Sequence, residues 1–418
     1  MSSKAIIAIL AGGAFLYHAL VAWRLADLEV FEQYNVLFNA DANIRLFNIA
    51  HGYLSEFKTH PLFHVFFSVP IRLVAGLLAP IIDVDAIAIR EQLALLVVPA
   101  LSAVRAAVVF VLARALGMPT SRAVWIAVLG LAMFSHALFG GIPEHAGVTG
   151  SLMALTYLLF AKGAMVPGRR ALVAWFVLGL LLVGVTSTNL MVLFFWLFAV
   201  FVGARCRPMA AGVKSAALCA LVVVLVFGTG KLWDESFGLA DTSYPPGEHV
   251  VSESGAALDR LSRVPTALAD TVVAFAPVLT ENELGRRNAS KYDVQLSYRH
   301  RERGAADVAL AIALLVVLVS GARIGSRSDP RVARMTGVSV AIILAHVVLF
   351  TVFGGPELIL YSQQWAFPVL FLVGLSLNEV MRRGRVGSVV STAIIVGIAI
   401  INLLTIEGIL TRLGELSE

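Results

Sequence analysis

Residues 92–113 read QLALLVVPALSAVRAAVVFVLA, and the basic turn RALG follows at 114–117. A run of about 20 mainly apolar residues is long enough for one helix to cross about 30 Å of hydrocarbon. The run therefore predicts a membrane-spanning helix that ends at a turn containing Arg114. Similar apolar runs, separated by polar turns, recur along the chain.

The composition places the whole chain in a membrane. Of its residues, 59% are hydrophobic and 14% are charged, and the mean hydropathy is +0.86. The surface of a soluble globule cannot accommodate so large an apolar share. We predict an all-α, polytopic bundle with about eleven crossings, at 5–23, 92–113, 122–140, 146–165, 171–186, 189–203, 214–231, 305–322, 335–353, 362–380 and 388–409.

Basic turns alternate with acidic turns along this run of helices. The basic turns hold one acid, Asp329, among Arg114, Arg122, Arg169, Arg170, Arg205, Arg207, Lys214, Arg323, Arg327, Arg331, Arg334, Arg382, Arg383 and Arg385. Because Lys and Arg accumulate in cytoplasmic loops, we assign these turns to the cytosol. The opposite turns carry Asp41, His51, His60, Glu144, His145, Glu357 and most of the remaining carboxylates. We therefore expect an integral, multi-pass protein of a bacterial plasma membrane with an extracytoplasmic site.

Residues 61–80 are apolar enough to form a further crossing, but Pro70 and Arg72 interrupt them. A proline inside a helix removes a backbone hydrogen bond that lipid cannot replace. We favour a juxtamembrane or re-entrant hairpin over a full crossing. A full crossing would place Asp41 and Glu144 on opposite sides of the membrane.

Three parts follow along the chain. Residues 1–231 form an N-terminal transmembrane module whose first outer loop is 24–91, and residues 305–418 form C-terminal transmembrane helices. Between them, 232–304 is an extracytoplasmic loop with an amphipathic stretch at 256–279. This stretch is expected to lie on the membrane surface, and Pro265 is expected to begin or break a helix there.

Two outer loops carry the most informative motifs. The first reads LFNADANIR at 37–45, followed by an amphipathic stretch to Gly52 and then KTHPLF at 58–63. The second reads GGIPEH at 140–145. Over residues 1–210 this arrangement resembles the GT-C superfamily of polytopic glycosyltransferases.

The resemblance implies that a sugar passes from a polyprenyl-phosphate carrier to a glycan, lipid or protein acceptor. It implies that Asp41 is the general base, because a positioned carboxylate can take the proton of a weakly nucleophilic hydroxyl. Attack assisted by one base would invert the anomeric centre. Capping of the following helix is the alternative role for Asp41. Glu144 would orient the acceptor or hold a divalent cation, or else pair with His145 or a nearby arginine.

Further polar residues of the outer loops are candidates for substrate binding. A fixed cation offsets charge on a departing phosphate, which favours Arg45 and Lys58 in the first loop and Arg299, Arg301 and Arg303 before 305. Sugar or phosphate contacts are also expected of His51, His60, His145, Asn189, Glu357, Tyr361 and Gln364. The alternative for each is an ordinary interfacial or ion-paired side chain.

Two other function classes remain open. One is a transporter or flippase of a lipid-linked or small polar solute, and the other is a non-catalytic subunit of an envelope-assembly complex. Arg105 lies within a crossing and must face protein or water, with His346 as a possible neighbour. The basic charge follows from the cytoplasmic turns, so no nucleic-acid partner is expected.

Overall fold

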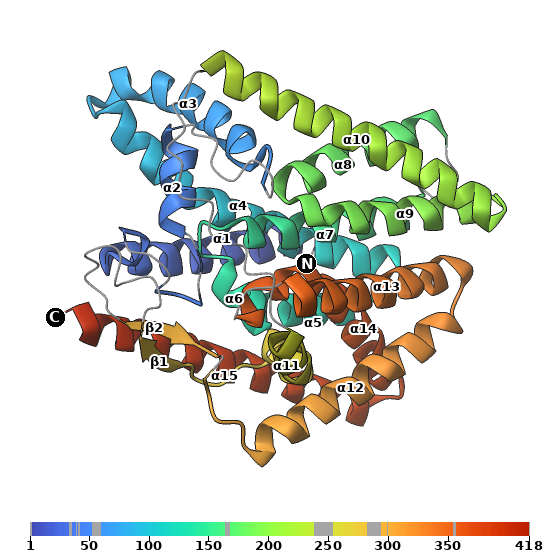
Figure 1. The fold of residues 1–418 in the computed structure, drawn as a ribbon. Coiled ribbons are helices and arrows are strands. Elements are labelled where there is room, and N and C mark those ends of the chain that lie inside the picture. The colour runs from blue at the N-terminus through green and yellow to red at the C-terminus, as the bar shows by residue number, and fades with distance from the viewer. Residues whose placement is uncertain are drawn as a thin grey trace.

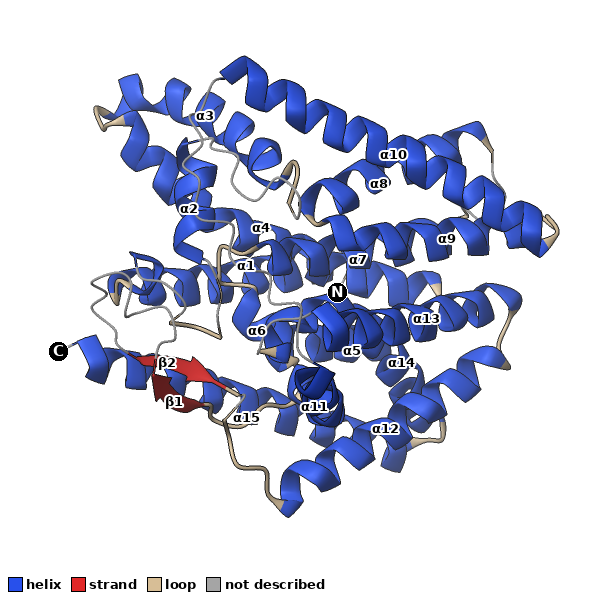
Figure 2. Ribbon diagram, viewed as in Figure 1, coloured by secondary structure: helices blue, strands red, loops and turns tan. Residues whose placement is uncertain are grey.

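The computed structural model describes residues 2–32, 36–38, 40, 42–51, 60–163, 168–237, 254–281, 294–298, 300–353 and 357–417. Helices make up nearly all of this part of the chain (Figures 1 and 2). The N-terminal half contains α1 (Ser3–Asp27), η1 (Val30–Glu32), α2 (Ala42–His51), α3 (Phe63–Ile82), α4 (Ala86–Ala115), α5 (Thr120–Ala132), α6 (Phe134–Phe139), α7 (His145–Ala161), α8 (Arg169–Val185), η2 (Ser187–Asn189), α9 (Leu190–Gly203) and α10 (Pro208–Phe237).

The C-terminal half adds a short hairpin of strands to the helices. Its elements are α11 (Ser254–Val272), β1 (Val278–Glu281), β2 (Val294–Ser297), α12 (Ala305–Ser326), α13 (Pro330–Phe353), η3 (Leu358–Ser362), α14 (Gln363–Arg382) and α15 (Arg385–Ser417). The described chain contains eight helices that are long and apolar enough to cross a membrane. The protein is therefore an all-α, polytopic membrane bundle, as predicted.

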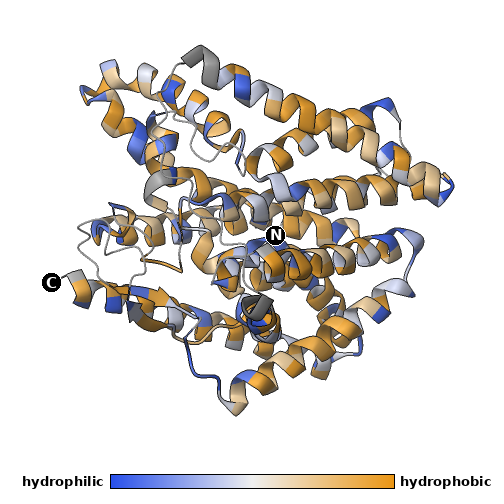
Figure 3. Ribbon diagram, viewed as in Figure 1, coloured by the Kyte–Doolittle hydropathy of each residue, from blue (hydrophilic) through white to orange (hydrophobic). Residues whose placement is uncertain are grey.

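The polar turns gather at the ends of this bundle. Apolar residues colour most of the helices in Figure 3, and hydrophilic residues concentrate in the connections. The basic turns after α9 and α12 lie at the right of Figure 1, and the β-hairpin and the C-terminus lie at the left. We call the right-hand end, with its Arg-rich turns, the basic end, and the left-hand end the opposite end.

Residues 61–80 differ in part from the prediction. Helix α3 runs without a break from Phe63 to Ile82 through Pro70, and it is one of the eight possible spans. It turns back at 83–85 and packs against α4 as a helical hairpin. Arg72 does not face lipid alone, because its guanidinium donates to the carbonyl of His51 at the end of α2.

Helix α11 also differs from the expectation. It begins at Ser254 and continues through Pro265 to Val272, so the proline neither begins nor breaks it. It packs against α6, α12, α13 and η3. The indole of Trp365 donates to Thr271 at 2.9 Å, which fixes this helix to α14.

The strands that follow α11 connect the long loop to the first loop. Strands β1 and β2 pair in antiparallel fashion. The first outer loop pairs with β2 in turn. The amide of Phe38 donates to the carbonyl of Leu296 in β2 at 3.0 Å, and the amide of Leu296 donates to the carbonyl of Val36 at 2.8 Å. The ring of Phe38 stacks on Tyr298, with centroids 5.2 Å apart. Segments far apart in sequence therefore meet at the opposite end of the bundle.

Candidate functional site

Glu144 lies where the second outer loop enters α7. Its side chain accepts a hydrogen bond from the amide of His145 at 2.8 Å and so caps the first turn of that helix. The preceding Gly140 permits this loop to approach α1, because a Cβ there would collide with the ring of His18. The loop thus holds a carboxylate that is only 1% exposed.

Arg45 meets this carboxylate from α2. Its Nε donates to Oε1 of Glu144 at 3.4 Å, and both side chains are 2% exposed. The same oxygen accepts from Nδ1 of His145. One buried carboxylate therefore joins the first and second outer loops and pairs with both His145 and an arginine, which is the alternative role given above for Glu144.

The pKa of Glu144 reflects these partners. Burial alone would raise it, but His145 and Arg45 outweigh burial and lower the pKa from 4.5 to about 2. Glu144 is accordingly a carboxylate at physiological pH. It is also a weak base, since its negative charge is already neutralised by its neighbours.

His60 approaches the same group from the turn before α3. Its Nδ1 lies 2.9 Å from the carbonyl oxygen of Val185 at the end of α8. Because a carbonyl only accepts, Nδ1 carries the proton. The ring lies against His145, with centroids 3.9 Å apart, and burial together with the positive charge of its neighbours holds the pKa of His60 well below 6.5.

His64 joins the group, although we did not predict it from the sequence. It lies one helical turn after His60 on α3, is 0% exposed, and interacts electrostatically with Arg45 and Glu144. Neither of its ring nitrogens has a hydrogen-bond partner among the described residues. The sequence offered only a weak signal, namely the spacing of four residues from His60, because His60 precedes the first turn of α3.

We call Arg45, His60, His64, Glu144 and His145 the loop cluster. It lies at the ends of short helices. At about 1.5 Å per residue, the 17 residues of α8 span about 26 Å and the 30 residues of α10 span about 45 Å. Figure 1 shows that α10 continues past the end of α8. The loop cluster therefore lies beside the end of α8, where the longer α10 continues.

Three predicted site residues, Asp41, Lys58 and Arg299, lie outside the described residues. Ala40 and Ala42 are buried, at 4% and 5% exposed. Three residues beyond Ala42, Arg45 belongs to the loop cluster.

His51 and Asn189 lie outside the cluster. His51 is the last residue of α2, and its Nε2 lies 3.8 Å from a carboxylate oxygen of Glu91 in α4. Asn189 is fully buried and donates to the carbonyl of Leu182 at 3.0 Å and to Thr149 at 3.4 Å. It ties the turn between α8 and α9 to α7, beside the turn that binds His60.

The predicted arginines before α12 bind other protein groups. Arg301 forms an ion pair with Asp307 at 2.5 Å, and its guanidinium lies 5.0 Å from the ring centre of Phe275. Arg303 donates to the carbonyl of Arg263 at 3.4 Å. The structure does not bring these two arginines to the loop cluster, and their contacts hold the segment before α12 against α11.

The predicted residues around η3 also have structural contacts. Glu357 accepts from the hydroxyl of Ser297 and from the amide of Tyr298, the latter at 3.1 Å. The ring of Tyr361 stacks on Phe350 with centroids 4.2 Å apart, and Gln364 is 2% exposed. Glu357 and Tyr361 fasten the β-hairpin and α13 to η3 instead of lining the loop cluster.

Arg105 faces protein, as expected. Its guanidinium donates to Gln363 at 3.1 Å, to Ser102 at 3.3 Å and to the carbonyl of His136 at 3.4 Å. His346 is not among these partners, because its Nδ1 donates to Ile342 at 2.9 Å. Arg105 therefore ties α4 to α6 and α14 within the bundle.

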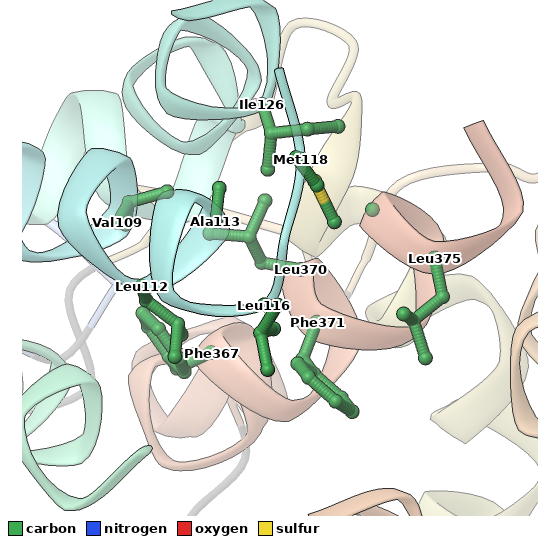
Figure 4. A pocket seen from close by; sticks show the side chains of 11 residues that line it. Val109, Leu112, Ala113, Leu116, Met118, Ile126, Phe367, Leu370, Phe371 and Leu375 are labelled. Carbon is green, nitrogen blue, oxygen red and sulfur yellow. The ribbon is translucent and has the colours of Figure 1, made fainter. Parts of the chain in front are cut away.

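A separate pocket lies between α4, α5 and α14 (Figure 4). It is lined by apolar side chains such as Leu112, Met118 and Phe371, and its volume is about 30 Å³. That is room for about one water molecule, so it is a packing defect and no substrate site. In the described chain, no group of three or more His, Cys, Asp or Glu residues is arranged to hold a metal ion.

Comparison with models of known protein families gives no match, and comparison with curated protein sequences gives none. The likeness to GT-C enzymes consequently rests on the motifs of the two outer loops.

Proposed function

We propose that this protein is a membrane glycosyltransferase of the GT-C type, which moves a sugar from a polyprenyl-phosphate carrier to an acceptor. The observation that carries the proposal is the loop cluster. Buried polar and charged groups are costly unless they are paired, and Arg45, His60, His64 and Glu144 are all buried at this one junction of loops. Ionisable groups with shifted pKa values are candidates for reaction sites.

The electrostatics favour a division of roles between the two acids. Glu144, with a pKa of about 2 and with Arg45 and His145 as partners, is a poor proton acceptor. We assign it to positioning, since it fixes the guanidinium and the imidazole. Asp41 remains the candidate general base that deprotonates the acceptor hydroxyl as it attacks the anomeric carbon with inversion.

The imidazoles and the guanidinium would act on the leaving group. Negative charge develops on the polyprenyl phosphate as the glycosidic bond breaks, and fixed donors stabilise that charge. His64 and His145 are the candidates to donate, because they lie beside Arg45 in the cluster.

The proposal includes a topology of eleven crossings with the Arg-rich turns in the cytosol of a bacterium. With the basic end in the cytosol, the loop cluster would face the outer side of the membrane, because it lies away from the basic end. The proposed reaction is therefore extracytoplasmic. On this topology α3 and the first part of α4 form a hairpin at the outer side. Its first turn begins beside the end of α8, where the amide of Leu62 donates to Gly184 at 2.8 Å.

The test is chemical. Purified protein in proteoliposomes is supplied with polyprenyl-phosphate sugars carrying a labelled sugar and with mixed glycan acceptors. The expected products are unglycosylated polyprenyl phosphate and a labelled acceptor, or free labelled sugar where water is the acceptor. No turnover of any carrier-linked sugar, with the protein folded, would refute the assignment.

A transporter is the second candidate, and one observation favours it. Within the predicted crossing 122–140, α5 ends at Met133, which takes an extended ψ of 129°, and α6 begins with Phe134. A helix interrupted inside a crossing is typical of transporters. Movement of the intact labelled lipid between leaflets, without cleavage of the sugar–phosphate bond, would favour this function over transfer.

A further inference from the structure

A groove of about 350 Å³ lies between α1 and α15, apart from the loop cluster. Leu20 of α1 and Leu403 and Ile406 of α15 supply apolar walls. Tyr17 lines the groove two helical turns before Arg24, a separation of about 10 Å along α1. At one end Leu28 lies beside Gly414, 3.9 Å from the position of an added Cβ, so the helices run alongside each other.

Two opposite charges line this groove. Arg24 lies in the last turn of α1, and Glu407 lies on α15. Both are exposed, and neither forms a side-chain hydrogen bond or an ion pair with any residue that the structure describes. An apolar channel with an unpaired cation and an unpaired anion fits a ligand that carries both charges and a long apolar tail.

We propose that this groove binds phosphatidylethanolamine. The phosphate would lie on Arg24, the primary ammonium would donate to Glu407, and one acyl chain would follow Leu20, Leu403 and Ile406. Charged hydrogen bonds to both groups select the headgroup. A choline headgroup offers no N–H to Glu407, and a glycerol headgroup offers it no cation. This inference does not depend on the proposed function.

The position of the groove agrees with a lipid ligand. Neighbouring side chains on both helices are apolar and exposed, including Leu16 at 68% and Leu404 at 68%, as expected of surfaces in contact with lipid. The charges lie toward the ends of the helices, where a headgroup would lie if the chain entered the hydrocarbon. A water-soluble ligand would leave these apolar side chains without a contact.

The test compares lipid retention. Protein in nanodiscs with equal amounts of phosphatidylethanolamine, phosphatidylcholine and phosphatidylglycerol is released and weighed by native mass spectrometry. Wild-type protein should retain phosphatidylethanolamine about ten-fold over the other two, the effect of one charged hydrogen bond. Glu407→Gln should abolish that preference, and Arg24→Gln should lower retention of all three lipids. Lys4→Gln, which removes a charge from the other end of α1, should change neither.

Several results would overturn the proposal. These are equal retention of all three lipids by wild-type protein, an unchanged preference in Glu407→Gln, and complete displacement of the lipid by added polyprenyl phosphate. The last would assign the groove to an isoprenoid chain. If a variant does not fold, stepwise N-methylation of the headgroup gives the same test on wild-type protein. Lipid retention that does not change with the number of N-methyl groups would contradict the role of Glu407.

Discussion

Replacement of Glu144 by glutamine tests whether the buried ion pair stabilises the junction of the two loops. Two independent magnitudes apply. A folded-state pKa of about 2, in place of 4.5, corresponds to about 3 kcal/mol of stabilisation. Loss of one partner from a buried pair costs about 3–5 kcal/mol, because the other charge remains buried. Since the contact between Arg45 and Glu144 is long, at 3.4 Å, we expect about 3 kcal/mol.

The assay is the free energy of unfolding in mixed micelles, measured by titration with a denaturing detergent. Because the folded pKa of Glu144 is lowered, its contribution is complete above about pH 4.5 and is lost as the pH falls toward 2. The wild-type advantage over Glu144→Gln should therefore shrink on acidification. Adding Arg45→Met to the variant should recover about 2 kcal/mol, since the buried guanidinium is then removed as well. A cost below about 1 kcal/mol with no recovery would refute this account of the cluster.

Three further predictions concern other parts of the molecule. His64→Phe keeps the ring and the fold but should lower transfer at least ten-fold in a turnover assay, and unchanged turnover would remove His64 from the site. Gly150→Ala should destabilise by about 1–3 kcal/mol in a thermal unfolding series, because a methyl group there collides with Gln363 and Arg105, whereas Gly12→Ala, with open space, should not. A membrane-impermeant thiol reagent should label a cysteine at 259 and not one at 328, and the reverse pattern would invert the topology.

The apolar runs predicted the helices well, because a residue facing lipid has to be apolar whatever its neighbours are. The long runs at 5–23, 92–113 and 388–409 appear as α1, α4 and α15. Proline was the weaker guide. Pro70 and Pro265 lie inside continuous helices, since packing against neighbouring helices stabilises the turns around a missing amide.

The contacts of the loops required the folded chain. Arg45 and Glu144 are 99 residues apart, so no local spacing predicts their ion pair. Strands β1 and β2 pair in antiparallel fashion, but the sequence between Glu281 and Val294 has no two-residue turn of the kind that signals a hairpin. Arg301 was a reasonable phosphate ligand by charge, but Asp307, six residues later, pairs with it in the structure.

The central claim is that a carboxylate of the first loop activates an acceptor beside the loop cluster. Turnover of polyprenyl-phosphate sugar by purified Asp41→Asn protein tests it most directly, because asparagine caps a helix about as well as aspartate but cannot take a proton. The account predicts folded protein that still binds the carrier lipid and a turnover lowered by about 10²–10⁴-fold. Turnover near that of the wild-type protein would contradict the account and leave Asp41 as a helix cap.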